Sequence, residues 1–141
     1  MSKVAVVYWS GTGNTEQMAN FVLEGAKNAG AEAELFPCDA FDSDLVDGFD
    51  GIAFGCSAQG DEVIEESEFE PMFSSCEPKL QGKRVALFGS YGWGDGEWMR
   101  SWEDRCSDRG ISLACESVIC NEYPDSAAID NCKALGAALA G

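Results

Sequence analysis

Histidine is absent from the 141-residue sequence, and basic residues are scarce. The lack of histidine excludes Ser-His-Asp and Cys-His catalysis and any histidine-ligated metal site. Nine Lys and Arg stand against 25 Asp and Glu, which gives a formal net charge of −16. So acidic a protein is disfavoured as a partner of nucleic acid or anionic membranes, but it suits docking onto basic protein surfaces.

Long apolar runs and closely spaced cysteine pairs are missing as well. The longest apolar run is too short to cross a membrane, so we expect no membrane span. The cysteines are odd in number and form no Cys-x-x-Cys pair: Cys38, Cys56, Cys76, Cys106, Cys115, Cys120 and Cys132. Without such spacing or a signal-peptide pattern, we expect reduced, mostly buried thiols in a cytoplasmic protein rather than a disulfide framework or an iron–sulfur cluster.

The apolar residues that are present alternate between strand-like and helix-like patterns. Strand-like runs occupy residues 4–8, 31–36, 51–56, 84–89 and 111–119. Helical spacing appears in three sets: Met18, Val22, Ala26 and Ala29; Met99, Trp102 and Cys106; Ala128, Cys132, Leu135 and Leu139. Gly30 and Gly110 are placed to end the first two helices, and residues 39–50 leave room for only a turn or two of helix. Continuous apolar strands separated by helices predict one α/β domain over residues 1–141, a doubly wound parallel sheet covered on both faces.

The first strand leads directly into Ser10-Gly11-Thr12-Gly13-Asn14-Thr15, where a helix begins. Glycines and short hydroxyl or amide side chains at a helix N-terminus can be a simple turn, but they also make a phosphate cradle. A nucleoside-triphosphate loop would need a lysine after the second glycine, and a dinucleotide loop would need a glycine where Glu16 stands. The pattern therefore favours a neutral cradle that holds a phosphomonoester without cleaving it.

Two further loops follow the third and fourth strand-like runs. Residues 57–62 read Ser-Ala-Gln-Gly-Asp-Glu, and residues 90–96 read Ser-Tyr-Gly-Trp-Gly-Asp-Gly. In an open parallel sheet, ligands bind outside the carboxyl ends of the strands, where all three loops meet. The aromatic rings of Tyr91 and Trp93 could fold back over the core, but in this setting they favour a flat aromatic ligand. Trp98 and Trp102, at helical spacing, are expected to pack in the core.

Through these three loops, the chain closely resembles the short-chain flavodoxins of anaerobic bacteria. The likeness lies in Tyr8-Trp9-Ser10-Gly11-Thr12-Gly13-Asn14-Thr15-Glu16, in Gly55-Cys56-Ser57-Ala58-Gln59-Gly60-Asp61-Glu62-Val63, and in Phe88-Gly89-Ser90-Tyr91-Gly92-Trp93-Gly94-Asp95-Gly96. The stretch Glu65-Glu66-Ser67-Glu68-Phe69-Glu70-Pro71 is similar too. The resemblance implies a flavodoxin-like, five-stranded fold and an electron carrier with bound FMN, with no catalytic residue and no metal.

By the same resemblance, the cofactor-binding residues fall into three groups. Ser10, Gly11, Thr12, Gly13, Asn14 and Thr15 would hold the FMN phosphate. Ser57, Ala58, Gln59, Gly60, Asp61 and Glu62 would lie along the isoalloxazine edge, with a Gly60–Asp61 peptide that turns on reduction and Glu62 at the flavin N3 edge. Ser90, Tyr91, Gly92, Trp93 and Gly94 would form the third loop, with Trp93 stacked on the outer ring face. Gln59 stands where related sequences often carry methionine, so we expect a more polar inner face.

The acidity suggests how such a carrier would be tuned. Carboxylates around an anionic hydroquinone oppose full reduction, so the protein is expected to cycle at low potential between semiquinone and hydroquinone. We expect a monomer whose redox partners carry basic docking surfaces. Two alternatives stay open: an FMN-dependent NAD(P)H or quinone reductase on the same fold, and a non-redox module that recruits a basic partner.

Overall fold

A five-stranded parallel sheet forms the centre of the computed structural model, which describes residues 2–11, 13–59, 63–92, 94 and 96–141. The strand order is β2-β1-β3-β4-β5. The strands are β1 Lys3–Trp9, β2 Glu32–Pro37, β3 Gly51–Cys56, β4 Arg84–Tyr91 and β5 Val118–Asn121. Every neighbouring pair is parallel, with Val4 of β1 opposite Ala33 of β2 on one side and Gly51 of β3 on the other. The predicted α/β parallel-sheet architecture is confirmed.

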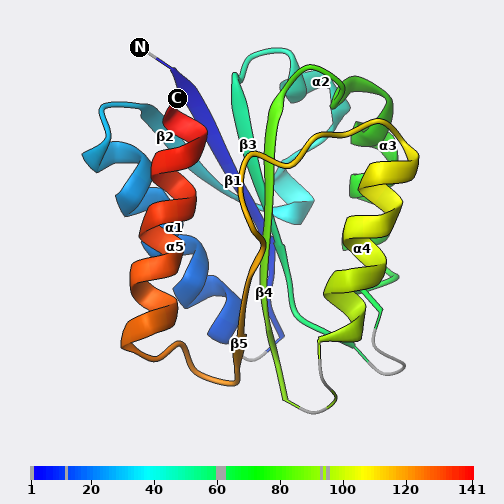
Figure 1. Ribbon diagram of the computed structural model, residues 1–141. Coiled ribbons are helices and arrows are strands. Elements are labelled where there is room, and N and C mark those ends of the chain that lie inside the picture. Colours follow the sequence, from blue (N-terminus) through cyan, green and yellow to red (C-terminus); the bar gives the residue numbers. More distant parts are fainter. Residues whose placement is uncertain (1, 12, 60–62, 93, 95) are drawn as a thin grey trace.

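Helices cover both faces of this sheet (Figure 1). One face is covered by α1 and α5, and the other by α3 and α4. The helices are α1 Asn14–Asn28, α2 Ser43–Val46, α3 Phe69–Cys76, α4 Glu97–Asp108 and α5 Ser126–Ala140, with 3-10 turns at Cys38–Ala40 and Glu77–Lys79. The connection predicted to hold only a short helix contains α2 and one of these turns. All strands run toward the lower end of the view in Figure 1, so their carboxyl ends share one edge of the molecule.

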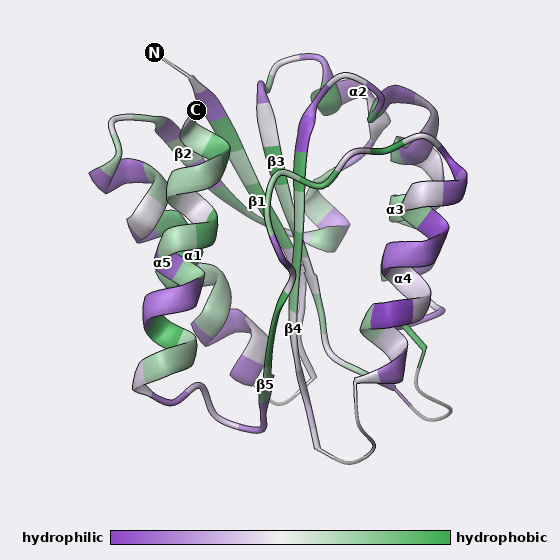
Figure 2. Ribbon diagram, in the orientation of Figure 1, coloured by the Kyte–Doolittle hydropathy of each residue, from purple (hydrophilic) through white to green (hydrophobic). Residues whose placement is uncertain are grey.

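The two faces of the sheet are packed with different side chains. The face under α3 and α4 is rich in aromatic rings, among them Phe54, Phe73 and Trp102, whose ring centroids lie 5.0 to 5.6 Å apart in edge-on pairs. The face under α1 and α5 is mainly aliphatic. Figure 2 shows hydrophobic residues along the central strands and on much of α5, and many hydrophilic residues on α4. Trp98 and Trp102 are buried, as predicted.

Glycines bring α1 and α5 into direct backbone contact. A Cβ on Gly25 would stand 2.0 Å from the Lys133 carbonyl oxygen, and one on Gly136 would stand 2.0 Å from the Val22 carbonyl oxygen. No side chain fits at either position without moving backbone. This close pairing fixes α1 and α5 against each other on one face of the sheet.

The ends of α1 and α4 follow the predicted glycine stops. Gly30 has a φ of 95°, its N–H donates to the Lys27 carbonyl, and the Ala31 N–H donates to the Ala26 carbonyl. Gly110 ends α4 in the same way with a φ of 73°. Both are Schellman motifs, in which glycine adopts the left-handed conformation that other residues avoid.

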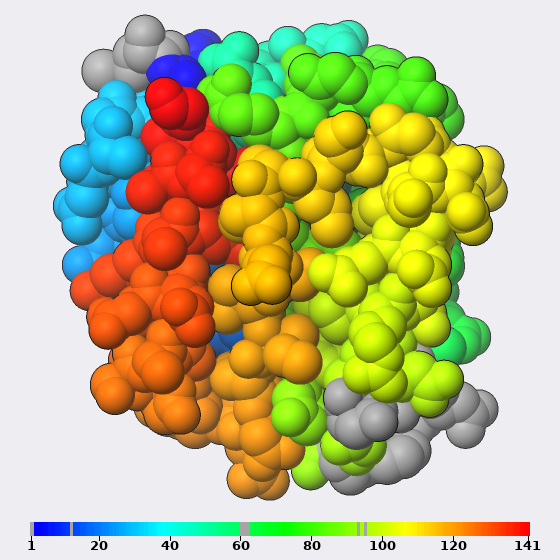
Figure 3. Space-filling view, viewed as in Figure 1, coloured from blue at the N-terminus to red at the C-terminus, as the bar shows by residue number. Residues whose placement is uncertain are grey.

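The last strand was predicted too early in the chain. The sequence suggested residues 111–119, but β5 is Val118–Asn121, and Leu113 makes only an isolated bridge to Val85. Ile111 is buried beside the end of α4, which explains its apolar character without a strand. Figure 3 shows residues 111–119 in yellow to orange between α5 and α4. Ser90 and Tyr91, assigned to a loop, are the last residues of β4.

The cysteines are free thiols, and five of them are buried. Burial raises the pKa of Cys38 and Cys76 to about 11 and that of Cys106 and Cys132 to about 12. These thiols therefore stay protonated at neutral pH, and their burial agrees with the expectation of mostly buried thiols. Among the described helices, none combines the length and apolar character needed to cross a membrane.

Candidate functional site

The loop between β1 and α1, predicted to hold a phosphate, lies at the carboxyl edge of the sheet. Gly13 has a φ of 94°, and its N–H donates to the Ser10 hydroxyl at 3.0 Å. The Gly13 carbonyl accepts from Gln17, and among the described residues no side chain caps the start of α1. The first amides of a 15-residue helix are thus left to face a ligand, which is the arrangement that binds anions. A Cβ on Gly11 would lie 3.1 Å from the Trp9 ring, so this position is also tight.

A single hydroxyl, that of Thr15, links this loop to the next two. Thr15 is fully buried, and its Oγ1 lies 2.7 Å from the Ser57 hydroxyl oxygen. The same oxygen accepts the backbone N–H of Ser90 at 3.3 Å. Three chain segments that are far apart in sequence are therefore joined at one buried polar point.

The loop after β3 is held by backbone pairing. Gln59 and Val63 form a two-way bridge, with N–H to carbonyl distances of 2.9 and 3.2 Å. The Ala58 N–H donates to the Ser90 carbonyl at 3.1 Å. The Gln59 side-chain amide turns back to donate to the Ala58 carbonyl at 3.1 Å, and the residue is only partly exposed.

The ends of β4 and β5 complete the site. The Ser90 hydroxyl donates to the Glu122 carbonyl at 2.6 Å, and the Glu122 N–H donates to the Tyr91 carbonyl at 2.7 Å. Glu122 is held at a φ of 58°, the one non-glycine residue with positive φ in the described chain. The Tyr91 ring packs on Trp98 with centroids 5.5 Å apart, and the Trp98 indole N–H donates to the Cys56 carbonyl at 3.2 Å.

A hollow of about 410 Å³ opens between these loops. Its described lining consists of Gly11, Asn14, Ser57, Ala58, Gln59, Ser90, Tyr91, Gly92, Glu122 and Tyr123. Eight of these are among the residues predicted to bind the cofactor; Glu122 and Tyr123 are not, because β5 was expected to end at Ile119. The size is within the range of small-molecule and cofactor sites.

The remaining predicted site residues fall into three groups. Ser10, Gly13 and Thr15 shape the hollow from behind through the hydrogen bonds above. Gly94 is described but does not line it. Thr12, Gly60, Asp61, Glu62 and Trp93 lie outside the described residues.

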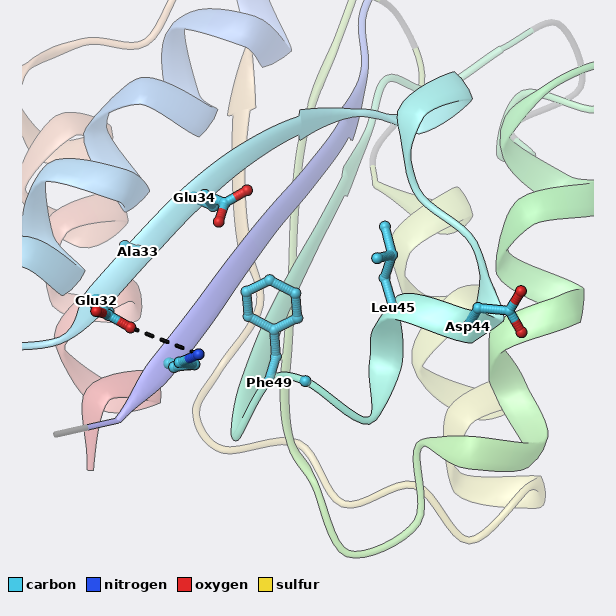
Figure 4. A pocket seen from close by; sticks show the side chains of 8 residues that line it. Glu32, Ala33, Glu34, Asp44, Leu45 and Phe49 are labelled. Carbon is cyan, nitrogen blue, oxygen red and sulfur yellow. Dashed lines mark ion pairs between the residues drawn. The ribbon is translucent and has the colours of Figure 1, made fainter.

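A second hollow, of about 290 Å³, lies at the opposite, amino edge of the sheet (Figure 4). Glu32 and Glu34 of β2 and Asp44 of α2 line it together with Leu45 and Phe49. Its one lining base, Lys3, is paired with Glu32 at 3.9 Å. Carboxylates repel phosphate, so the two hollows differ sharply in the ligand charge that they can accept.

Residues 6–136 match the family model described as Flavodoxin. The chain belongs to the flavodoxin family. Among its relatives, flavodoxin of Megasphaera elsdenii is 48% identical over 137 residues, covering 97% of this chain and 98% of that protein. Flavodoxin of Clostridium beijerinckii is 44% identical over 135 residues, covering 96% and 97%. The chain is thus an electron-transfer flavoprotein rather than an enzyme.

Solved flavodoxin structures agree with the fold. The solution structure of two-electron reduced Megasphaera elsdenii flavodoxin has a TM-score of 0.90 and 49% identity, covering 97% of this chain and 98% of that one. A flavodoxin from the domain Archaea has a TM-score of 0.86 at 26% identity, covering 98% and 96%. The prediction of a short-chain flavodoxin resembling those of anaerobic bacteria is confirmed.

The donor set of the carboxyl-edge hollow fits a flavin that carries a phosphate. Around it, the described cradle offers backbone N–H groups, the Ser10 hydroxyl and the Asn14 amide, all of which are neutral. Neutral donors at a helix N-terminus suit a phosphate, and the Tyr91 and Tyr123 side chains suit a flat ring. Among the described lining residues, Glu122 alone carries a formal charge.

Proposed function

We propose that the protein is a one-electron carrier that binds FMN non-covalently in the carboxyl-edge hollow. It works at low potential, between the half-reduced and fully reduced cofactor. The observation that carries the proposal is the neutral phosphate cradle at the start of α1, joined through Thr15 to both neighbouring loops. Family membership supports it.

In this proposal the β1–α1 loop holds the phosphate. Backbone amides at the start of α1 and the side chains of Ser10 and Asn14 would donate to the phosphate oxygens. The role of Thr12, which lies outside the described residues, is the one that the family resemblance gives. Hydrogen bonds to a charged group each contribute about 1.5–3 kcal/mol. Because none of these donors carries a formal charge, the phosphate is bound without placing a cation near the flavin.

The loops after β3 and β4 hold the ring system in this proposal. FMN, when bound, supplies the ability to take up and return one electron at a time. Ser57, Ala58 and Gln59 would line one edge of the ring, and Tyr91 and Gly92 would shape the other loop. For Gly60, Asp61, Glu62, Trp93 and Gly94, the roles given by the family resemblance stay part of the proposal.

Gln59 would make the inner side of the site more polar than a methionine would. Its amide is tied to the Ala58 carbonyl and is only partly exposed, so it stays at the hollow rather than in solvent. A polar group at this position exchanges dispersion contact with the ring for hydrogen bonding. We expect Gln59→Met to change FMN affinity measurably.

The acidity of the chain supports a low potential. A carboxylate ~12 Å from a newly formed negative charge opposes it by ~1.4 kcal/mol at an effective dielectric near 20, or ~60 mV for one electron. With a formal net charge of −16, several such contributions are available. We further propose that the protein is a cytoplasmic monomer and that its redox partners dock through basic surfaces.

Anaerobic redox titration of the FMN-loaded protein tests this function. We expect a spectrum of the one-electron-reduced flavin at intermediate potentials and a second midpoint potential well below that of free FMN. Two midpoint potentials close to those of free FMN would contradict the low-potential role. A purified protein that never takes up FMN would contradict the cofactor itself.

A further inference from the structure

Glu65 is a buried carboxylate that the electron-carrier function leaves without a role. Glu65 is only 8% exposed to solvent. The carboxylate accepts three backbone N–H groups, from Ser67 at 2.8 Å, Glu68 at 2.7 Å and Phe69 at 2.9 Å. Burial alone would raise the pKa of Glu65, but these hydrogen bonds outweigh it and hold the pKa below its usual value. Glu65 is therefore an ionised side chain fixed against the start of α3.

The backbone of Glu65 reaches in the other direction, to the end of β3. Its N–H donates to the Cys56 Sγ at 3.3 Å, and its carbonyl accepts the Glu70 N–H at 2.9 Å. Cys56 is the last residue of β3 and immediately precedes the Ser57 that lines the hollow. Glu65 thus joins the point where the chain leaves the sheet to the point where it enters α3.

Only one residue separates Glu65 from the paired part of this loop. Val63 is bridged to Gln59 by two backbone hydrogen bonds, and Ile64 between Val63 and Glu65 is 7% exposed. A buried residue of this kind cannot move freely, because its neighbours are close-packed. Buried Ile64 therefore links Glu65 directly to the Gln59–Val63 bridge beside the hollow.

We propose that Glu65 is a positioning residue for the loop that faces the cofactor, with the three amides at the start of α3 as its anchor. This inference rests on the proposed FMN function. The charge makes the anchor strong, because hydrogen bonds to an ionised acceptor are about twice as strong as neutral ones. An amide cannot replace it, since the NH₂ group of glutamine would meet one of the three N–H donors.

Glu65→Gln tests the anchor, and Glu66→Gln is its matched control. The neighbouring Glu66 is exposed, so its substitution removes the same charge without touching these hydrogen bonds. For Glu65→Gln we expect roughly tenfold weaker FMN binding, as the loss of one charge-assisted hydrogen bond gives. In the FMN-free protein we expect amide hydrogen exchange at Gln59 and Val63 to rise by a similar factor. Glu66→Gln should change both quantities less than about twofold.

A second pair of variants tests the link to β3 without altering charge. Cys56→Ala removes the sulfur that accepts the Glu65 N–H, whereas Cys56→Ser retains an acceptor. We expect Cys56→Ala to weaken FMN binding and to speed exchange at Gln59 and Val63 by about threefold more than Cys56→Ser does. This pair keeps the inference testable if Glu65→Gln folds poorly.

The alternative is that Glu65 only caps α3. In that case Glu65→Gln would lower the melting temperature and speed exchange at Ser67, Glu68 and Phe69, with FMN affinity and the exchange of Gln59 and Val63 unchanged. That result would overturn the inference. Failure of the proposed function is distinguishable, because the unaltered protein would then bind no FMN while the exchange measurements on Glu65→Gln would still report on positioning.

Discussion

The two edges of the sheet each carry a hollow of a size that admits a small molecule, yet their chemistry is opposite. At the carboxyl edge the described lining is neutral except for Glu122, and none of the described side chains caps the start of α1 beside it. At the amino edge, Glu32, Glu34 and Asp44 face a hollow whose one base is already paired. Shape alone does not distinguish a cofactor site from a surface depression here. The charge of the lining residues and the backbone N–H donors at the start of α1 do distinguish the two hollows.

The two hollows also arise in different ways. The carboxyl-edge hollow is constructed by hydrogen bonds between loops, centred on Thr15 and Ser90. The amino-edge hollow exists because α2 has only four residues and leaves Leu45 and Phe49 incompletely covered beside β2. Removing a single hydrogen-bonding atom should therefore alter the carboxyl-edge hollow. The same kind of change should have little effect on the amino-edge hollow.

Adding a negative charge to the carboxyl-edge hollow should have the largest effect on FMN binding. Asn14→Asp keeps the size of the side chain and places a carboxylate in the cradle. At ~4 Å and an effective dielectric near 20, two like charges repel by ~4 kcal/mol, so we expect FMN binding to weaken by at least ~100-fold. Thermal stability should not fall, because acidic residues stabilise helix N-termini. Fluorescence titration with FMN and a melting curve measure the two effects.

Asp44→Asn is the matched control at the amino edge. It removes a carboxylate from the other hollow and should change FMN affinity less than about twofold, since exposed charges this far away are screened by salt. Equal losses of affinity in Asn14→Asp and Asp44→Asn would show that general charge, and not the cradle, governs binding.

Removing the hydroxyl that joins three loops should have the next largest effect. Thr15→Val replaces Oγ1 by a methyl group and leaves the Ser90 N–H and the Ser57 hydroxyl without this partner. Leaving a buried donor unsatisfied costs about 1–3 kcal/mol, so we expect a loss of that size in the free energy of unfolding and about tenfold weaker FMN binding. Denaturant-induced unfolding measures the loss of stability, and titration with FMN measures the loss of affinity. Thr15→Ser keeps the hydroxyl and should retain most of both; an equally weak Thr15→Ser would point to packing of the methyl group instead.

Loosening the β5 side of the site should have a smaller effect. Ser90→Ala removes the hydrogen bond to the carbonyl of Glu122, the residue with a positive φ. A single neutral hydrogen bond contributes about 1 kcal/mol, so we expect roughly fivefold weaker FMN binding. Isothermal titration of the variant with FMN measures it. Unchanged affinity would mean that Glu122 and Tyr123 line the hollow without contributing to binding.

The smallest effect should come from Glu34→Gln at the amino edge. Exposed surface substitutions usually change stability by less than about 0.5 kcal/mol, and we expect FMN affinity to change less than twofold. A melting curve and an FMN titration suffice. A tenfold change in affinity would remove the distinction between the two edges.

Much of the fold could be predicted because its signals are local. Gly30 and Gly110 end α1 and α4 as expected, since few residues other than glycine tolerate the left-handed conformation there. The strand at residues 51–56 is apolar throughout because it is buried on both faces, and its bounds were predicted correctly. The three loops at residues 10–15, 57–62 and 90–96 were found because each follows a strand at the carboxyl edge.

The rest depends on contacts between distant segments. Ile111 and Leu113 are apolar because they pack under α4 and beside β4, so their pattern imitated a strand that begins only at Val118. With β5 displaced, Glu122 and Tyr123 fell outside the expected site. The α3 helix was not assigned in advance, because its start depends on the Glu65 carboxylate rather than on a Ser, Thr, Asp or Asn immediately before it. Hydrogen bonds such as Thr15 to Ser57 cannot be predicted from spacing.

The central claim is that a neutral cradle at the carboxyl edge binds the phosphate of FMN. It is tested most directly by titrating the FMN-free protein with FMN and with riboflavin, which lacks the phosphate, while following backbone amide NMR signals. The account predicts that FMN binds at least ~100-fold more tightly, because two charge-assisted hydrogen bonds alone supply that factor. It also predicts shifts at Gly13, Asn14 and Thr15 with FMN and none at Lys3 or Glu34. Equal affinity for the two ligands, or FMN-induced shifts confined to the amino edge, would contradict it.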